Sequence, residues 1–186
     1  MKDRVEFAED WYNRGCRALD NENVFEAYIY LWLSLTIAAK QHVANNGRLD
    51  SDNDEIRDVE HIVYWMENYG KPGQIIRILK LHQDDIMELC DRVGTESSDP
   101  LIDINSRRYY EQILKFHRDF VKYWQEGATY IEEYKVARTF LELLNRVRNN
   151  LFHGGKSFKV SSDRRLLELL CPSLKSISKL CIDQAR

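Results

Sequence analysis

The sequence predicts an all-α protein, a bundle of six or seven helices, on three observations. Apolar residues recur at three- and four-residue spacing over most of the 186 residues. The 3 prolines and 8 glycines are too few for a turn-rich β architecture. No segment shows the strict alternation of polar and apolar residues that a half-buried strand requires. The length predicts one domain, residues 1–186, with a sizeable core.

The first two helices are expected over residues 3–20 and 24–44, separated by a polar run at 21–23. The segment FEAYIYLWLSLTIAAK within the second helix is apolar on nearly every side. In a protein that folds in water, such a helix is central and is covered by several neighbours. Part of it could instead face another subunit, but the core is the favoured interpretation.

The middle of the chain alternates polar loops with amphipathic segments. A polar, turn-rich loop at 44–54 precedes a helix expected over 54–68. Gly70 to Gly73 form a turn before a helix expected over 74–92. The segment GTESSDP at 94–100 is a second loop. Apolar spacing therefore predicts two helices in this part of the chain.

A fifth helix is expected over 107–126, with Ser106 as its N-cap. Its many aromatic residues could stack on nucleic-acid bases, but their spacing favours a core role. Gly127 then marks a break before a helix over 129–152. A serine at 161 or 162 can cap the last helix, which Pro172 could kink or divide.

Composition describes an ordinary globular protein, with 44% hydrophobic and 31% charged residues. The chain start lacks the apolar run of a signal peptide, and the longest uncharged stretch, 27–39, is too short to span a bilayer. Four cysteines without a close pair indicate reduced thiols and argue against a zinc site. We therefore expect a cytoplasmic protein without a metal or other cofactor, whose cysteines are Cys16, Cys90, Cys171 and Cys181.

Positive charge is concentrated in one window, residues 143–162, which contains no Asp or Glu. The window carries +4, which leaves −7 for the rest of the chain because the net charge is −3. A solvated helix face is the simplest explanation of such a cluster. The alternative is a local contact with phosphate groups, since the chain as a whole is not basic.

The same window contains the stretch LLNRVRNNLFHGGK, which ends an amphipathic helix at a pair of glycines. Arg148 and His153 lie five positions apart in it, so on an unbroken helix they point about 140° away from each other. They can converge only if the helix stops between them. Gly154 and Gly155 follow His153 directly and favour such a stop.

An arginine followed five positions later by a histidine is a weak pattern by itself. Sixteen arginines and five histidines predict about 0.4 matches by chance in a chain of this length. A second match, Arg77 and His82, occurs in the helix expected over 74–92, where no glycine stops the helix. Ile78 also replaces the polar residue that follows Arg148. We therefore interpret Arg77 and His82 as ordinary helix residues.

The stretch RNNLFHGGK resembles the signature of the HEPN superfamily, helical domains with an arginine, a polar residue and a terminal histidine. FEAYIYLWLSLTIAAK is similar to the central tryptophan-bearing helix of the Apea-like branch. The resemblance implies a HEPN-like helical bundle. It further implies a metal-independent ribonuclease of toxin–antitoxin, phage-defence or CRISPR systems, with RNA as substrate.

The resemblance assigns catalytic roles to three residues. His153 would act as general acid or base at the 2′-hydroxyl or the leaving oxygen, since histidine titrates near neutral pH. Arg148 would hold the phosphate with its charged fork. Asn149 would orient His153 or donate to the phosphate. Further residues would contact the RNA backbone without reading its sequence, namely Asn150, Arg146, Lys156 and Lys159.

One arginine and one histidine make a thin active site. In the resemblance, two HEPN domains pair so that both motifs line one cleft, which for this chain requires a homodimer. An antitoxin or regulatory protein is a possible further partner. The alternative function is a non-catalytic HEPN domain that binds RNA, a nucleotide or a partner protein. Arg148 could also simply pair with an acidic residue while His153 caps a helix end.

Overall fold

In the computed structural model, every regular element among the described residues is a helix, which confirms the predicted all-α class. The chain divides into two compact units, unit 1 comprising Met1–Lys71 with Ser173–Arg186, and unit 2 comprising Pro72–Pro172. The structure describes residues 4–45, 58–95, 115–116, 118–120, 122, 129–152 and 161–186.

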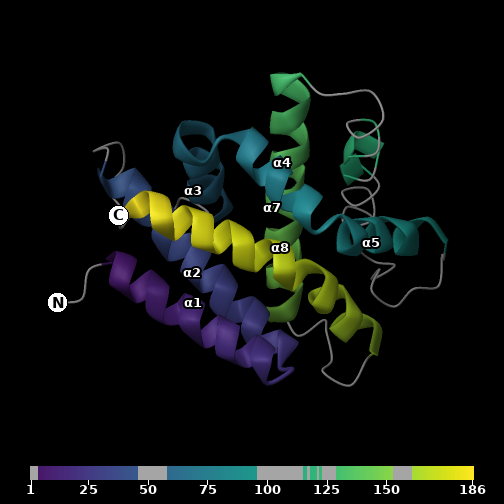
Figure 1. The fold of residues 1–186 in the computed structure, drawn as a ribbon, viewed down its shortest axis with the longest axis horizontal. Helices are drawn as coiled ribbons and strands as arrows, with labels where there is room; N and C mark the ends of the chain where they lie inside the picture. The colour runs from purple at the N-terminus through teal and green to yellow at the C-terminus, as the bar shows by residue number, and fades with distance from the viewer. Residues whose placement is uncertain are drawn as a thin grey trace. The chain divides into compact units, whose positions relative to one another are not determined.

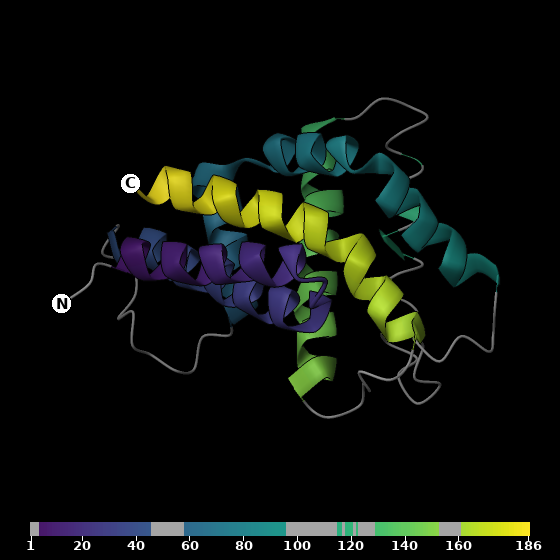
Figure 2. The ribbon, with the colours of Figure 1, turned by 60° about the horizontal axis from the view of Figure 1, so that its bottom comes forward.

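Unit 1 begins with two helices, α1 (Arg4–Asp20) and α2 (Val24–Asn45), close to the predicted ranges. They lie side by side and antiparallel, joined by a three-residue turn (Figures 1 and 2). The Asn23 side chain accepts a hydrogen bond from the Glu26 backbone N–H at 3.4 Å, a weak N-cap of α2. Polar residues at 21–23 therefore end one helix and begin the next.

Helix α2 is buried around most of its circumference, as its apolar sequence predicts. Thirteen of its 22 residues are buried, including Trp32 and the polar Ser34 and His42. The C-terminal part of α8 (Ser161–Ala185) packs against it within unit 1, where the Ser178 hydroxyl lies 3.0 Å from the Leu31 carbonyl oxygen. These observations confirm the core interpretation for most of α2.

The third predicted helix begins as an α-helix and ends as a π-helix. Helix α3 (Asp58–Trp65) continues as the π-helix η1 (Met66–Gly70), which leaves only Lys71 between it and the next helix. Lys71 has a φ of 52°, a conformation that side chains other than glycine rarely adopt. At Gly70, a Cβ atom would lie 2.8 Å from the Trp65 ring, so the packing of that ring requires glycine there.

Unit 2 contains α4 (Pro72–Leu81), α5 (Gln83–Thr95), α7 (Tyr130–Phe152) and the N-terminal part of α8. The single helix predicted over 74–92 is wrong, because the chain breaks at His82 and continues as a second helix. The His82 N–H approaches the carbonyl oxygens of Ile78 and Leu79, each at 3.2 Å, as in a tightened last helical turn. Asp84 and Asp85 in the first turn of α5 then favour a new helix start.

Helix α7 is anchored by aromatic contacts. The Phe140 ring lies 5.3 Å from that of Phe116, which stacks on Phe120 at 5.4 Å. All three side chains are fully buried, so the core interpretation of these fifth-helix aromatics is correct. The remainder of the helix predicted over 107–126 lies mostly outside the described residues. Helix α8 runs through Pro172 without being divided.

Candidate functional site

The predicted site residues fall partly within the described structure. Arg146, Arg148 and Asn149 lie in the last turns of α7, and all three side chains are half-buried. Asn150 belongs to the same helix, but its side chain lies outside the described residues. Also outside them are His153, Lys156 and Lys159. The structure therefore describes the two arginines and Asn149 of the predicted site, but not its histidine.

Helix α7 starts directly after Thr129, which the Glu132 side chain caps. The Glu132 carboxylate accepts hydrogen bonds from the Thr129 N–H at 2.9 Å and from its hydroxyl at 3.1 Å, and these bonds hold the pKa of Glu132 below its ordinary value. The predicted apolar face is then buried along the helix up to Val147, which is 3% exposed. Because this face is fixed in the core, the helix carries Arg148 and Asn149 on a rigid element.

Arg148 and Asn149 interact directly. The Arg148 Nη1 atom donates a hydrogen bond to Asn149 Oδ1 at 2.9 Å, while Arg148 Nε is buried. Adjacent helix residues point about 100° apart, so this bond forms only because the long arginine side chain bends toward its neighbour. An arginine has donors only, which fixes the oxygen of the Asn149 amide on the arginine side. The Asn149 Nδ2 donors therefore face away from Arg148.

This arrangement suits recognition of an anion. The guanidinium group is planar, always charged and matches the geometry of two phosphate oxygens. The Asn149 amide restrains that group from one side and offers its own N–H donors from the other. Positive charge and N–H donors thus meet at the last turns of α7, within the basic window at 143–162.

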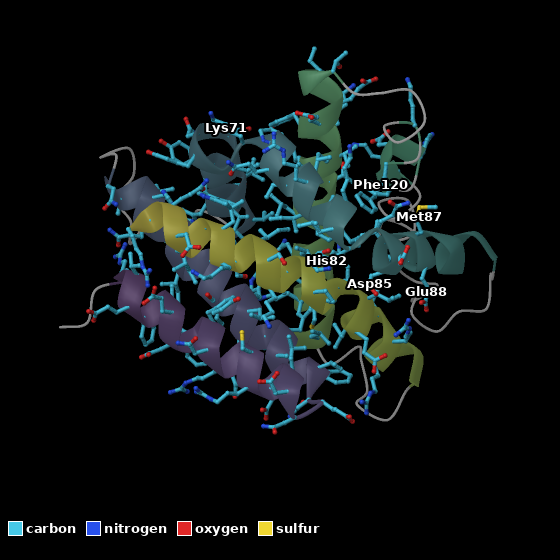
Figure 3. All side chains as sticks on the ribbon, in the orientation of Figure 1. Lys71, His82, Asp85, Met87, Glu88 and Phe120 are labelled. Carbon is cyan, nitrogen blue, oxygen red and sulfur yellow. The ribbon has the colours of Figure 1, made fainter. Side chains whose placement is uncertain are left out.

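The structure overturns one reason for dismissing the second arginine–histidine pair. His82 does not lie inside a helix but at the junction of α4 and α5, where Figure 3 labels it with Asp85. Its side chain is half-buried, and burial lowers its pKa although the Asp85 charge opposes that shift. A shallow surface hollow lined by residues 80–85 lies at the same junction. Arg77 is exposed, and Ile78 still departs from the pattern, so this pair becomes a control for experiments.

Outside the candidate site, the side chains of His42, Cys171 and Cys181 are buried in the core. His42 is buried in unit 1, where its Nε2 lies 3.1 Å from the Cys181 carbonyl oxygen and its ring packs 4.7 Å from Tyr69. Burial lowers the pKa of His42 and raises that of the Cys171 and Cys181 thiols. Sequence reasoning did not single out His42, because a lone histidine in an apolar helix carries no motif.

Among the described residues, no helix has the length and apolar character needed to cross a membrane. Within the same residues, no group of three or more His, Cys, Asp and Glu side chains is arranged to hold a metal ion.

Of the three candidate catalytic residues, Arg148 and Asn149 lie together in the last turns of α7. The chain matches no known protein family, and no characterised protein or solved structure shows significant similarity to it.

Proposed function

We propose that this chain is a metal-independent RNA endonuclease of the HEPN type, acting in the cytoplasm as a toxin or in phage defence. The active form is a homodimer with a composite site. The observation that carries the proposal is the Arg148–Asn149 pair at the last turns of α7, five and four residues before His153. The basic window around that pair supports RNA as the ligand.

The proposed reaction uses the RNA's own 2′-hydroxyl as nucleophile. Its oxygen attacks the adjacent phosphorus, the P–O5′ bond breaks, and the products carry a 2′,3′-cyclic phosphate and a 5′-hydroxyl. The Arg148 guanidinium stabilises the charge that develops on the phosphate oxygens. Asn149 Nδ2 supplies a neutral donor to the same group.

The reaction includes two proton transfers, and these are the reason why the proposed site needs two copies of the chain. One proton leaves the 2′-hydroxyl, and another is delivered to the departing 5′-oxygen. A single histidine cannot hold both positions at once. In the composite site, His153 of one subunit acts as base and that of the other subunit acts as acid, so each copy contributes one proton transfer.

The test is cleavage of structured and unstructured RNA by the purified chain in the presence of EDTA. Replacing Arg148→Ala or His153→Ala should lower the rate by about a hundredfold or more, because each removes charge stabilisation or proton transfer. Arg77→Ala and His82→Ala are matched controls, since they remove an equally spaced pair, and should leave the rate unchanged. Equal cleavage by all five proteins would indicate a contaminating nuclease and refute the proposal.

If two subunits share the site, the cleavage rate should also depend on protein concentration. The rate per subunit should rise with protein concentration until the dimer is saturated. Cleavage by a species that remains monomeric in light scattering would refute the shared site. RNA binding without cleavage by intact dimers would instead favour the alternative, a non-catalytic HEPN domain that binds RNA.

A further inference from the structure

Unit 1 carries a cluster of aromatic rings at its surface, on α1 and the adjoining part of α2. Phe7 is 46% exposed and meets Trp11 edge-on, with 6.0 Å between ring centroids. Trp11 lies 5.3 Å from Tyr30, and the Arg14 guanidinium sits 4.9 Å above the Trp11 ring. Trp11 and Tyr30 are half-buried and Arg14 is exposed. These side chains therefore lie at the surface, outside the fully buried core.

The cluster continues onto the outer side of α2. Leu33 and Ile37 are only half-buried and follow Tyr30 at three- and four-residue spacing, so they lie on one helix face. Gly15 of α1 packs against Leu31 of α2, and the antiparallel register places Phe7 level with the turn of α2 that contains Ile37. We call this surface the aromatic face, defined by Phe7, Trp11, Tyr30, Leu33 and Ile37.

The chemistry of the aromatic face indicates a protein partner. Tryptophan, tyrosine and arginine are the residues that dominate binding energy at protein interfaces. Exposed rings can also stack on RNA bases, but RNA binding needs a basic surround. Helix α1 carries three arginines and four acidic residues, so it is slightly acidic. The charge of α1 therefore favours protein over RNA.

The charges of α1 also identify the partner. Glu6 and Arg17 are both exposed, lie on the same side of α1 and are placed symmetrically about its centre at Trp11 and Tyr12. When two copies of α1 cross antiparallel at that centre, Glu6 faces Arg17 of the partner subunit, and the twofold axis repeats the pair. Such self-complementarity is what a twofold interface requires.

We propose that the aromatic face docks against the same face of a second copy of the chain, with the two α1 helices antiparallel. Phe7, Trp11 and Leu33 form the apolar centre of the interface, and the Glu6–Arg17 pairs fix its register. The inference deepens the proposed function, which needs a second copy to complete the site, but its own evidence is independent of the nuclease motif. The proposed interface also explains why the outer side of α2 is apolar.

The test is the dimer dissociation constant, measured by sedimentation equilibrium. Phe7→Asp should weaken the dimer roughly a hundredfold, because it buries a charge among the aromatic rings. Leu81→Asp and Ile131→Asp are matched controls, since these residues are 79% and 64% exposed and do not belong to the aromatic face. The controls should dimerise as the unmodified chain does, and circular dichroism verifies that each variant is folded.

Charge exchange tests the antiparallel register. Glu6→Arg and Arg17→Glu should each weaken the dimer about tenfold or more, since each places two like-charge pairs across the axis. The double variant restores the pairs and should recover the original dissociation constant. Failure of this recovery would overturn the antiparallel arrangement.

The remaining outcomes separate this inference from the nuclease proposal. A monomeric unmodified chain, or a dimer insensitive to Phe7→Asp, would overturn the aromatic interface whether or not RNA is cleaved. Loss of RNA binding with the dimer intact would also overturn it, since the face would then be an RNA surface. A dimer that responds as expected but cleaves no RNA would support the interface and refute only the nuclease.

Discussion

The close approach of α1 and α2 in unit 1 leads to a sharp prediction at Gly15. A Cβ atom added there would lie 2.7 Å from Leu31 Cγ and 2.8 Å from its Cδ2. Leu31 is fully buried, and its backbone N is 3.3 Å from the same position, so the leucine cannot simply rotate away. Gly15→Ala must therefore push the two helices or the Leu31 side chain apart.

The expected magnitude follows from two opposing terms. Alanine is favoured over glycine inside a helix by about 1 kcal/mol. Inserting a methyl group into a packed core costs about 1–3 kcal/mol. Gly15→Ala should therefore lower the free energy of unfolding by about 1 kcal/mol. Leu31→Ala removes the obstructing atoms and should by itself lower the free energy of unfolding by about 2–5 kcal/mol. In that background, Gly15→Ala should raise the free energy of unfolding by about 1 kcal/mol.

Urea unfolding of the original chain, both single variants and the double variant gives the coupling between the two sites. It should be about 2 kcal/mol, and the sign of the Gly15→Ala effect should reverse between the two backgrounds. Asn13→Ala, on the exposed side of α1, reports helix propensity without the contact. Equal destabilisation by Gly15→Ala in both backgrounds would refute the packing of Gly15 on Leu31.

Two further predictions concern buried and paired charges. Because burial lowers the pKa of His42 below 6.5, the unfolded chain takes up the proton more readily, so stability should fall as the pH drops through and below that value. His42→Gln should flatten this dependence in urea midpoints measured between about pH 5 and 7.5, and parallel curves for both proteins would contradict it. In unit 2, Arg165 binds Glu88 through two hydrogen bonds of 2.9 and 2.5 Å, but both side chains are 39% exposed. Glu88→Gln should therefore cost no more than about 1 kcal/mol, and the loss should shrink in high salt.

Helices whose buried face repeats along the sequence were predictable. For α1, α2 and α7 the predicted and observed ends agree within one or two residues. The reason is that burial of apolar side chains dominates folding, and its period is written directly in the residue order. For α2, the lack of a polar face predicted its central position in unit 1 for the same reason.

The break between α4 and α5 was not predictable from periodicity. Ile75, Leu79, Ile86 and Leu89 continue the helical spacing across it, and neither glycine nor proline marks the site. The available signal was the pair Asp84 and Asp85, which suits the first turn of a helix better than its middle. The π-helix Met66–Gly70 had no such signal, because π-helices are rare single-turn features without a distinctive residue pattern.

For the candidate site, the sequence identified the chemical groups but not their connection. Asn149 was expected to orient His153 or to donate to phosphate, and its bond to Arg148 was not foreseen because adjacent helix residues normally diverge. That bond engages one lone pair of the Asn149 oxygen and leaves its Nδ2 donors for either expected role. In the proposed site, Asn149 would therefore restrain the Arg148 guanidinium through its oxygen and donate to the phosphate through Nδ2.

The distribution of charge bears on the proposed nuclease. Each copy carries +4 within residues 143–162 and −7 elsewhere, so a single basic window would offer RNA only a small local excess of positive charge. In the composite site of the proposed nuclease, two such windows would line one cleft, which doubles the number of cations near the RNA. Affinity for RNA depends steeply on the number of neutralised phosphates. Dimerisation would then complete the catalytic groups and supply the positive charge that holds RNA against them.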